Sequence, residues 1–307
     1  MTMLIMLAEY ASALGLGGNC EMEGRAMLST LAGSLQRLGH NVSYPSSGHR
    51  TGAGEPIFIE GQRDFEEVLG SQEAEAGLLI APDELQGHLL EILESRTANL
   101  GCSPQAAQLC ADKLLSTQRL KENRVPVADV VAGPDVLTGC SRYVIKPRFG
   151  CGSEGVRVVS QPRPPQGYIV TRYVEGLHLS ASFIVGREGF LPLTINRQII
   201  NFQGEGMSYQ GSQVPYRTPR EAEIWEAAAK AASVLGLSGY AGIDFVVGDL
   251  PRVVDVNARP TTSIVGIAQV MKEELGDLIL RARFGGMPEK VTISGECSFT
   301  KDELSCR

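Results

Sequence analysis

The sequence predicts an α/β fold with an N-terminal parallel sheet, a small β-rich middle region and a C-terminal α+β unit. Over residues 3–96, apolar strand-like runs alternate with helical segments, which is typical of a parallel sheet covered by helices. From residue 125 the chain changes to short β runs separated by Gly and Pro. Beyond residue 219, two long helical segments flank a hairpin pattern. We therefore expect domains at 1–100, 101–176 and 177–307.

The first unit is expected to alternate strands with helices. Leu28, Leu31, Leu35 and Leu38 recur three or four residues apart, which places them on one face of a helix over 21–39. Gly39 is expected to end this helix. Residues 9–19 are rich in Gly and predict a loop. The other elements predicted here are strands at 3–8, 40–45, 56–61 and 76–82 and a helix at 64–70.

The remainder of the chain is expected to be mostly β, with three long helices. The polar, Gly-rich stretch 201–211 predicts a long connection of the kind that often carries function, with an ordinary surface loop as the alternative. Helices are predicted at 104–122, 219–237 and 265–285. The β runs lie at 125–132, 142–147, 155–160, 167–174, 179–186 and 190–200, and a hairpin is predicted at 240–260.

The composition excludes several classes of protein. The chain has 307 residues, 43% of them hydrophobic, which is enough for a large core. A net charge of −7, the lack of a long basic run and only 6% aromatic residues argue against a nucleic-acid partner. No apolar run reaches the roughly 18 residues of a membrane helix, and residues 3–8 lack a signal peptide's basic start. Seven cysteines without C-x-x-C and four scattered histidines predict neither disulfides nor zinc, so we expect a cytoplasmic protein.

Residues 143–159 contain the motif G-x-G-x-x-G at Gly150, Gly152 and Gly155. A dinucleotide-binding loop would need a helix after the glycines, whereas "VRVVS" at 156–160 reads as a strand. Strand, glycine loop and strand instead predict a flap whose backbone N–H groups approach phosphates. A plain Gly-rich hairpin is the alternative. Lys146 favours the flap, because a lysine within "YVIKP" is odd in a core but sensible as a phosphate ligand.

The hairpin pattern at 240–260 carries a second group of polar residues. Taking 248–251 as a four-residue loop places Asp244 opposite Asp255, with Asn257 on the same face. Two carboxylates directly opposite each other should repel, and a divalent cation would turn that repulsion into attraction. Such oxygen ligands suit Mg²⁺ that is shared with substrate phosphates. Solvated acids on an open strand face are the alternative.

Two arginines lie close to these elements in the sequence. Arg259 follows the hairpin directly, and Arg197 lies in the β run "TINRQ". Either guanidinium could stabilise a transferred phosphoryl group, so both are candidate catalytic residues. An ordinary surface arginine is the alternative for each.

The order of these parts resembles the ATP-grasp superfamily over nearly the whole chain. Its members have an N-terminal α/β domain, a small β-rich lid and a larger C-terminal domain, and they hold ATP between the last two. The resemblance implies an ATP-grasp fold here, with ATP and Mg²⁺ or Mn²⁺ as cofactors.

The resemblance also implies roles for single residues. Lys113 in "ADKLLSTQRLKENRVPVADV" and Lys146 match the family's two phosphate-binding lysines. The family often has Glu where Arg172 and His178 stand, and Pro where Ala258 stands. "FGCGSEGV" (149–156) matches the flap, which implies ATP contacts from Gly150, Gly152, Ser153 and Gly155. "IVTRYVEG" (169–176) matches the hinge that binds adenine and ribose, which implies contacts from Tyr173, Val174, Glu175 and His178, and Asp244, Asp255 and Asn257 match the metal ligands.

More narrowly, "EYAS", "EGRAML", "NRQ" and "DVNARPTTS" resemble the tyramine–L-glutamate ligases of methanofuran biosynthesis. This resemblance implies that the γ-carboxylate of glutamate is joined to the amine of tyramine, or of a related compound such as tyrosine. Glu9, Arg25, Gln198 and the stretch 201–211 are then expected to bind the substrates. Members of the superfamily are often homodimers.

Other functions remain open from the sequence, the first being an ATP-grasp ligase that joins another pair of amino acids or peptides. A phosphotransferase acting on a hydroxyl would share the ATP site, and only its product would differ. A non-catalytic nucleotide-binding module would have no need of the complete set of Asp244, Asp255 and Asn257. An NAD-dependent oxidoreductase would need a helix after Gly155, which the sequence does not offer.

Overall fold

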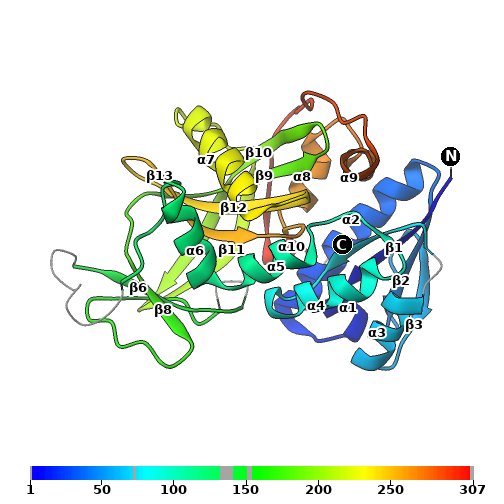
Figure 1. Cartoon of the computed structure of the whole chain (residues 1–307), viewed down its shortest axis with the longest axis horizontal. Coiled ribbons are helices and arrows are strands. Elements are labelled where there is room, and N and C mark those ends of the chain that lie inside the picture. Colours follow the sequence, from blue (N-terminus) through cyan, green and yellow to red (C-terminus); the bar gives the residue numbers. More distant parts are fainter. Residues whose placement is uncertain (1, 72–73, 132–140, 151–153, 305–307) are drawn as a thin grey trace.

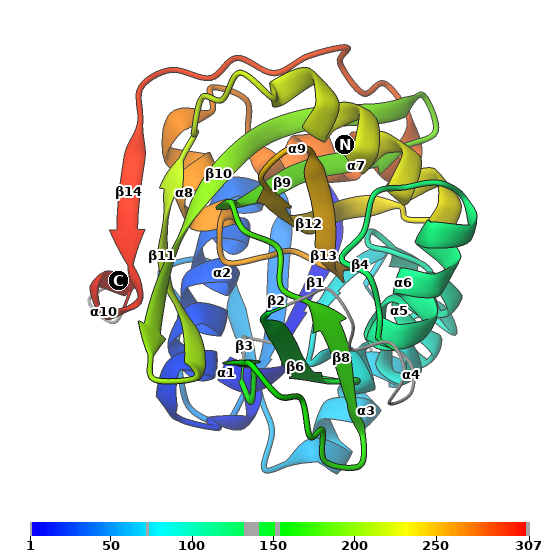
Figure 2. The same ribbon diagram turned by 90° about the vertical axis from the view of Figure 1, so that its left-hand side faces the viewer.

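The computed structural model describes residues 2–71, 74–131, 141–150 and 154–304, and its elements form two sheets. Figure 1 shows the first sheet, coloured blue to cyan, on the right, and strands β6 and β8 on the left. The remaining strands of the second sheet lie between them. Figure 2 views the molecule from the side of β6 and β8.

The first sheet is parallel and has the strand order β3-β2-β1-β4-β5. Alternate side chains of β1 enter different cores, Met6 and Ala8 on one face and Ile5 and Leu7 on the other. Both faces are therefore covered, as expected of a parallel sheet. The elements are β1 (Leu4–Glu9), α1 (Tyr10–Leu14), α2 (Gly18–Arg37), β2 (Asn41–Ser46), β3 (Glu55–Phe58), α3 (Gln62–Ser71), β4 (Ala76–Ile80), α4 (Asp83–Glu94) and β5 (Ala98–Asn99).

The second sheet is antiparallel and nine-stranded, with the order β13-β12-β9-β10-β11-β7-β6-β8 and β14 paired to β11. We call β6, β7 and β8 the lid. The lid joins the other strands through one register pair, Gly206 with Arg157. The strands are β6 (Tyr143–Pro147), β7 (Arg157–Val159), β8 (Tyr168–Arg172), β9 (Leu177–Gly186), β10 (Gly189–Gln203), β11 (Gly206–Val214), β12 (Gly239–Val247), β13 (Pro251–Asn257) and β14 (Cys297–Thr300).

Six helices accompany this sheet: α5 (Pro104–Ala111), α6 (Lys113–Glu122), α7 (Glu221–Leu235), α8 (Ile264–Val270), α9 (Leu275–Phe284) and α10 (Lys301–Leu304). The two large apolar cores each contain residues of both sheets. Leu79 of β4 and Phe245 of β12 share one core, and Leu7 of β1 and Tyr240 of β12 share the other. The lid has a small core of its own, made by Tyr143, Ile145, Val159 and Val170.

Two predicted helices are broken in the structure. The helix predicted at 104–122 is two helices, because Asp112 has extended backbone angles (φ −86°, ψ 95°) and its carboxylate caps α6. The helix predicted at 265–285 is also two. Met271 pairs with Ile293 in a β-bridge, and Glu274 is extended before α9. Tertiary contacts override helical propensity at both points.

Other sequence predictions need correction. The loop predicted at 201–211 is a hairpin, because β10 runs to Gln203 and β11 starts at Gly206. The β run predicted at 125–132 contributes only isolated bridges, at Val127 and Val130, within its described residues. The elements α1, α4, β5, β14 and α10 were not predicted. The domain boundaries at 100 and 176, the homodimer and the cytoplasmic location stay predictions. Within the described residues, no helix combines the length and apolarity needed to cross a bilayer.

Gly24→Ala is expected to destabilise the first unit. The Glu9 carboxylate caps α1 by accepting from the backbone N–H groups of Ala11 and Ser12, and a Cβ at Gly24 would overlap it. Loss of the cap and overpacking should together cost about 2–3 kcal/mol, measured by chemical denaturation. Gly33→Ala in the same helix α2 is the control, because its nearest neighbour is the flexible end of Arg37. We expect Gly33→Ala to stabilise the protein by about 1 kcal/mol, and equal effects of the two variants would contradict this account.

Candidate active site

Lys113 begins helix α6 directly after the helix break, and this break fixes its position. Arg148, at the end of the lid strand β6, forms a two-pronged ion pair with Asp112 (2.8 and 2.6 Å). The backbone N–H of Lys113 donates to the Arg148 carbonyl at 3.0 Å. The Lys113 ammonium then reaches both carboxylate oxygens of Asp255 (2.9 and 3.1 Å) and lies 3.6 Å from Asp83.

Asp244 of β12 and Asp255 of β13 are directly paired across the hairpin, and Asn257 follows opposite Gly242. The loop assumed in the prediction is wrong, because Val247 pairs with Pro251 and the turn is one residue shorter. A β-bulge at Val254 restores the register, since Asp244 pairs with Asp255 while Phe245 pairs with Val253. Val254 and Asp255 both line the cleft described below.

The two carboxylates differ in their pKa. Burial, reinforced by the nearby Asp255 charge, raises the pKa of Asp244 to about 7. Burial alone would also raise the pKa of Asp255, but the ammonium groups of Lys113 and Lys146 outweigh it and lower that pKa. Gln198 donates to Asp244 at 3.0 Å. Asp255 is therefore held ionised by its lysines, whereas a pKa of about 7 leaves Asp244 about half protonated at pH 7.

Lys146 points from the lid strand β6 toward the bulge. Its ammonium donates to the backbone carbonyl of Val254 at 2.5 Å, and burial lowers its pKa. Along β6, Val144 and Lys146 face the cleft, whereas Tyr143 and Ile145 enter the lid core. This alternation explains how a strand that looks apolar in sequence presents one ammonium to a binding site.

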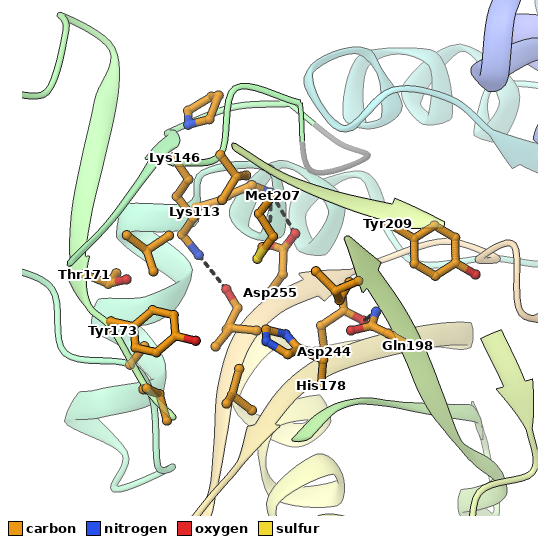
Figure 3. A pocket seen from close by; sticks show the side chains of 18 of the residues that line it. Lys113, Lys146, Thr171, Tyr173, His178, Gln198, Met207, Tyr209, Asp244 and Asp255 are labelled. Carbon is orange, nitrogen blue, oxygen red and sulfur yellow. Dashed lines mark hydrogen bonds and ion pairs between the residues drawn. The ribbon is translucent and has the colours of Figure 1, made fainter. Parts of the chain in front are cut away.

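These groups line a cleft of about 920 Å³, open solvent at its mouth included, between the lid and strands β12 and β13. Figure 3 shows Lys113, Lys146, Asp244 and Asp255 converging, with Tyr173 on one side and Tyr209 on the other. The apolar lining includes Ala128, Val144, Val156, Ile200, Met207, Val246 and Val254. A largely apolar cleft with a few convergent charges is typical of a site for a small molecule.

The hinge lies at one edge of this cleft. Tyr173, Val174 and His178 line it, and burial lowers the pKa of His178, so this side chain is neutral at pH 7. Glu175 instead forms an ion pair with Arg142 and is 81% exposed. Its predicted contact with ribose stays a prediction.

The described residues at the two ends of the flap line another side. Gly150 and Gly155 have positive φ angles (118° and 71°), and space beside Gly150 is open. A Cβ at Gly155 would lie 3.0 Å from the Tyr168 hydroxyl, so this turn favours glycine. Gly150, Glu154 and Val156 line the cleft. Gly152 and Ser153, predicted to contact ATP, lie outside the described residues.

The predicted catalytic arginines lie apart from the cleft lining. Gln198 faces the cleft, so its neighbour Arg197 faces the opposite side of β10, where its guanidinium lies 5.8 Å from the centre of the Tyr216 ring. Arg259 is nearer, because it donates to Asp83 at 3.1 Å and Asp83 also neighbours Lys113. Their catalytic roles stay predictions.

The predicted substrate residues Glu9 and Arg25 also lie outside the cleft lining. Glu9 is buried as the cap of α1, and desolvation raises its pKa. Arg25 forms an ion pair with Glu21, while its buried Nε has no hydrogen-bond partner among the described residues. Of the predicted substrate residues, Gln198 lines the cleft, and so do Met207 and Tyr209 of the predicted stretch 201–211.

The sequence reasoning missed some features of the residues in and near the cleft. Met207 and Tyr209 belong to the stretch 201–211 that was expected to bind substrates, but their place on a strand was missed, because the segment was interpreted as a loop and their period of two was overlooked. Asp83 lies outside the cleft lining but 3.6 Å from the Lys113 ammonium; it stands three residues after the end of β4 in "LLIAPDE", and an acidic residue just after a buried strand was an overlooked signal. Thr171, opposite Val144 in the lid, carried no recognisable signal.

The donor set fits a magnesium ion. Asp244 and Asp255 supply facing carboxylates and Asn257 an amide oxygen on the same hairpin, which are the hard oxygen donors that Mg²⁺ prefers. The raised pKa of Asp244 shows a carboxylate whose charge lacks sufficient compensation from the protein. A cation would supply that compensation, and Asp244, Asp255 and Asn257 would hold it.

Comparison with known proteins identifies the class. A family model described as an ATP-grasp domain matches residues 110–263, half of the chain. An ATP-grasp superfamily protein from Archaeoglobus fulgidus superposes with a TM-score of 0.78 at 25% identity, covering 97% of this chain and 99% of its own. An N5-carboxyaminoimidazole synthetase from Staphylococcus aureus, solved with ADP, superposes at 0.74 with 16% identity over 97% of this chain and 82% of its own, which shows the fold. The chain belongs to the ATP-grasp family.

Among curated relatives, a tyramine–L-glutamate ligase from Methanocaldococcus fervens is 29% identical over 91% of this chain and 93% of its own length. The enzyme of the same name from Methanocaldococcus jannaschii is 28% identical over 86% of this chain and 84% of its own. The fold, the family and these relatives identify the protein as an ATP-dependent ligase of the carboxylate–amine class, which acts on small molecules.

Replacing either cleft lysine by Met is expected to weaken ADP binding about tenfold or more, but with different effects on stability. Lys113→Met leaves Asp255 and Asp83 without their ammonium, which should cost about 3 kcal/mol. Lys146→Met removes a donor to a neutral carbonyl and should cost about 1 kcal/mol or less. Calorimetric titration with ADP and denaturant unfolding measure the two effects. Equal destabilisation by both variants would contradict the assigned charge pairing.

The metal-free protein is expected to lose stability as pH rises from 5 to 8. The folded state holds a proton on Asp244 up to about pH 7, whereas the unfolded state releases it near pH 4. Ionisation of the folded protein then sets Asp244 against Asp255. Asp244→Asn should therefore melt a few degrees above the wild type at pH 8 and near it at pH 5, measured in EDTA. Asp249→Asn, on the exposed turn of the same hairpin, should show no such pH-dependent difference.

Proposed function

We propose that this ligase phosphorylates the γ-carboxylate of glutamate with ATP and transfers the acyl group to the amine of tyramine or a related amine such as tyrosine. The observation that carries the proposal is the convergence of two lysines and two facing carboxylates in one cleft beneath the flap. The two tyramine–L-glutamate ligases, which match most of the chain, support the choice of acid and amine.

In the first step, an oxygen of the substrate carboxylate attacks the γ-phosphorus of ATP, the bond to the β–γ bridging oxygen breaks, and ADP leaves with that electron pair. Lys113 and Lys146 neutralise phosphate charge and orient the chain of phosphates. When bound, Mg²⁺ would supply further charge neutralisation at Asp244, Asp255 and Asn257. The product of this step is an acyl phosphate and ADP.

In the second step, the deprotonated amine attacks the acyl carbon, and the bond from this carbon to the phosphate oxygen breaks. An amide and inorganic phosphate result, and the proton of the attacking amine passes to solvent or to phosphate. The lid and flap exclude water, which would otherwise hydrolyse the acyl phosphate. Arg259, held beside Asp83, is the arginine better placed to stabilise the transferred phosphoryl group.

The test is a reaction of the purified protein with Mg·ATP, glutamate and tyramine, followed by mass spectrometry of the product and an assay of ADP. We expect one amide for each ADP, and no ADP when either substrate is omitted. Asp255→Ala should lower the rate by at least about 100-fold, because it removes a metal ligand and the partner of Lys113. Asp249→Ala, on the turn of the same hairpin, should leave the rate unchanged.

The rival functions give different products. A phosphotransferase would yield a phosphorylated hydroxyl compound and no amide. A non-catalytic module would bind ATP without releasing ADP. If ATP turns over without an amide, trapping with hydroxylamine over a panel of acids tells whether an acyl phosphate forms at all.

A further inference from the structure

Beyond the ATP cleft, four side chains from distant parts of the sequence meet on the side of Asp244 away from the hinge. Figure 3 shows Tyr209 on that side, across Asp244 from Tyr173. The Lys301 ammonium lies 5.3 Å from the centre of the Tyr209 ring and 2.6 Å from Oε1 of Glu23. The Thr262 hydroxyl donates to Oε2 of Glu23 at 2.5 Å. We call Glu23, Tyr209, Thr262 and Lys301 the Glu23–Lys301 cluster.

The ion pair at the centre of this cluster is largely removed from water. The side chain of Lys301 is 13% exposed and that of Glu23 is 18% exposed. The cost of taking two charges out of water offsets most of their mutual attraction, so such a pair gives little net stability. Folding alone therefore does not account for a pair that joins helix α2 of the first unit to helix α10.

Tyr209 connects the cluster to the reaction site. It lines the ATP cleft together with Gln198 and Asp244. Burial is the main cause of its raised pKa, and the negative charges of Glu23 and Asp244 both add to it. Thr262 lies between strand β13, which carries Asp255, and helix α8. The cluster thus lies beside the metal-binding carboxylates, opposite the hinge.

We propose that the Glu23–Lys301 cluster binds the α-ammonium and α-carboxylate of the amino acid whose side-chain carboxylate is phosphorylated. This inference rests on the proposed function. Glu23 accepts hydrogen bonds from the ammonium, and Lys301 donates to the carboxylate. The zwitterion replaces the internal ion pair, and each protein charge exchanges one opposite partner for another. Thr262 and the face of the Tyr209 ring hold the two side chains in place.

Two analogues of glutamate separate the roles of the two charges. Glutarate lacks the α-ammonium, and 4-aminobutyrate lacks the α-carboxylate, while both keep the carboxylate that reacts. A site that pairs both groups should prefer glutamate to either analogue, because each analogue leaves one buried charge without its partner.

The experiment measures kcat/KM for glutamate, glutarate and 4-aminobutyrate at saturating Mg·ATP and tyramine. Glu23→Gln should reduce the preference for glutamate over glutarate by about 10- to 100-fold. Lys301→Met should reduce the preference for glutamate over 4-aminobutyrate by a similar factor. The KM for ATP should stay unchanged in both variants. Arg281→Met, which removes an exposed ion pair with Asp277 on α9, should change neither preference.

A charge exchange tests for a purely structural pair. The double variant Glu23→Lys/Lys301→Glu retains an ion pair and should recover thermal stability, but the KM for glutamate should stay raised because the polarity of the site is reversed. Recovery of both properties would overturn the proposal. If a single variant fails to fold, Glu23→Asp and Lys301→Arg, which keep the charges but move them, should raise the KM for glutamate and not for ATP.

The failure of this inference is distinct from the failure of the proposed function. A wild-type protein that makes no amide from glutamate overturns the proposed function, and this inference with it. An active wild type whose Glu23 and Lys301 variants keep both preferences overturns the inference alone.

Discussion

The repulsion between Asp244 and Asp255, which face each other across one hairpin, is the constraint on which the site depends. The Lys113 ammonium forms an ion pair with Asp255. Lys113 reaches that position because Asp112 interrupts the helix before it and pairs with Arg148 at the end of the lid strand. Lys146 approaches from the lid, and the bulge at Val254 provides the carbonyl that receives it. The lid therefore contacts the hairpin through Lys146 and the helix break through Arg148.

Local patterns in the sequence predicted the charged residues of the cleft better than they predicted the elements around the cleft. The facing of Asp244 and Asp255 was predicted correctly from a turn that was one residue too long, because the bulge at Val254 compensates for the error. The adjacent apolar residues Val253 and Val254 interrupt the alternation where the bulge lies, but this signal was not used, so the turn length and the bulge were distinguished only in the structure. Lys146 was recognisable because a charged residue in an apolar strand stands out, whereas Lys113 was identified through the resemblance to the ATP-grasp superfamily.

Features that depend on tertiary contacts could not be predicted from local patterns in the sequence. The break at Asp112 requires the partner Arg148, which lies 36 residues later. The orientation of Arg197 depends on which face of β10 meets the cleft, and because its neighbours Asn196 and Gln198 are also polar, the sequence does not distinguish the two faces. The cap at Glu9 was missed because residues 9–19 were interpreted as a Gly-rich loop, although its partners Ala11 and Ser12 lie only two and three residues later. The meeting of Glu23 with Lys301 joins segments at opposite ends of the chain.

The apolar cores hold the two sides of the site, the lid on one side and the rest of the second sheet with the first sheet on the other, to different extents. The first sheet and strands β9 to β13 share their cores, so the wall near α2 and the floor that bears Asp244 are bound by extensive common packing. The lid has only a small core and one register pair to β11. A large angular movement of the lid therefore need not disturb the main packing. The part of the site near α2, where we propose that the acid binds, can therefore be preformed by this common packing. The lid, which lines the nucleotide cleft, can change its position relative to that part.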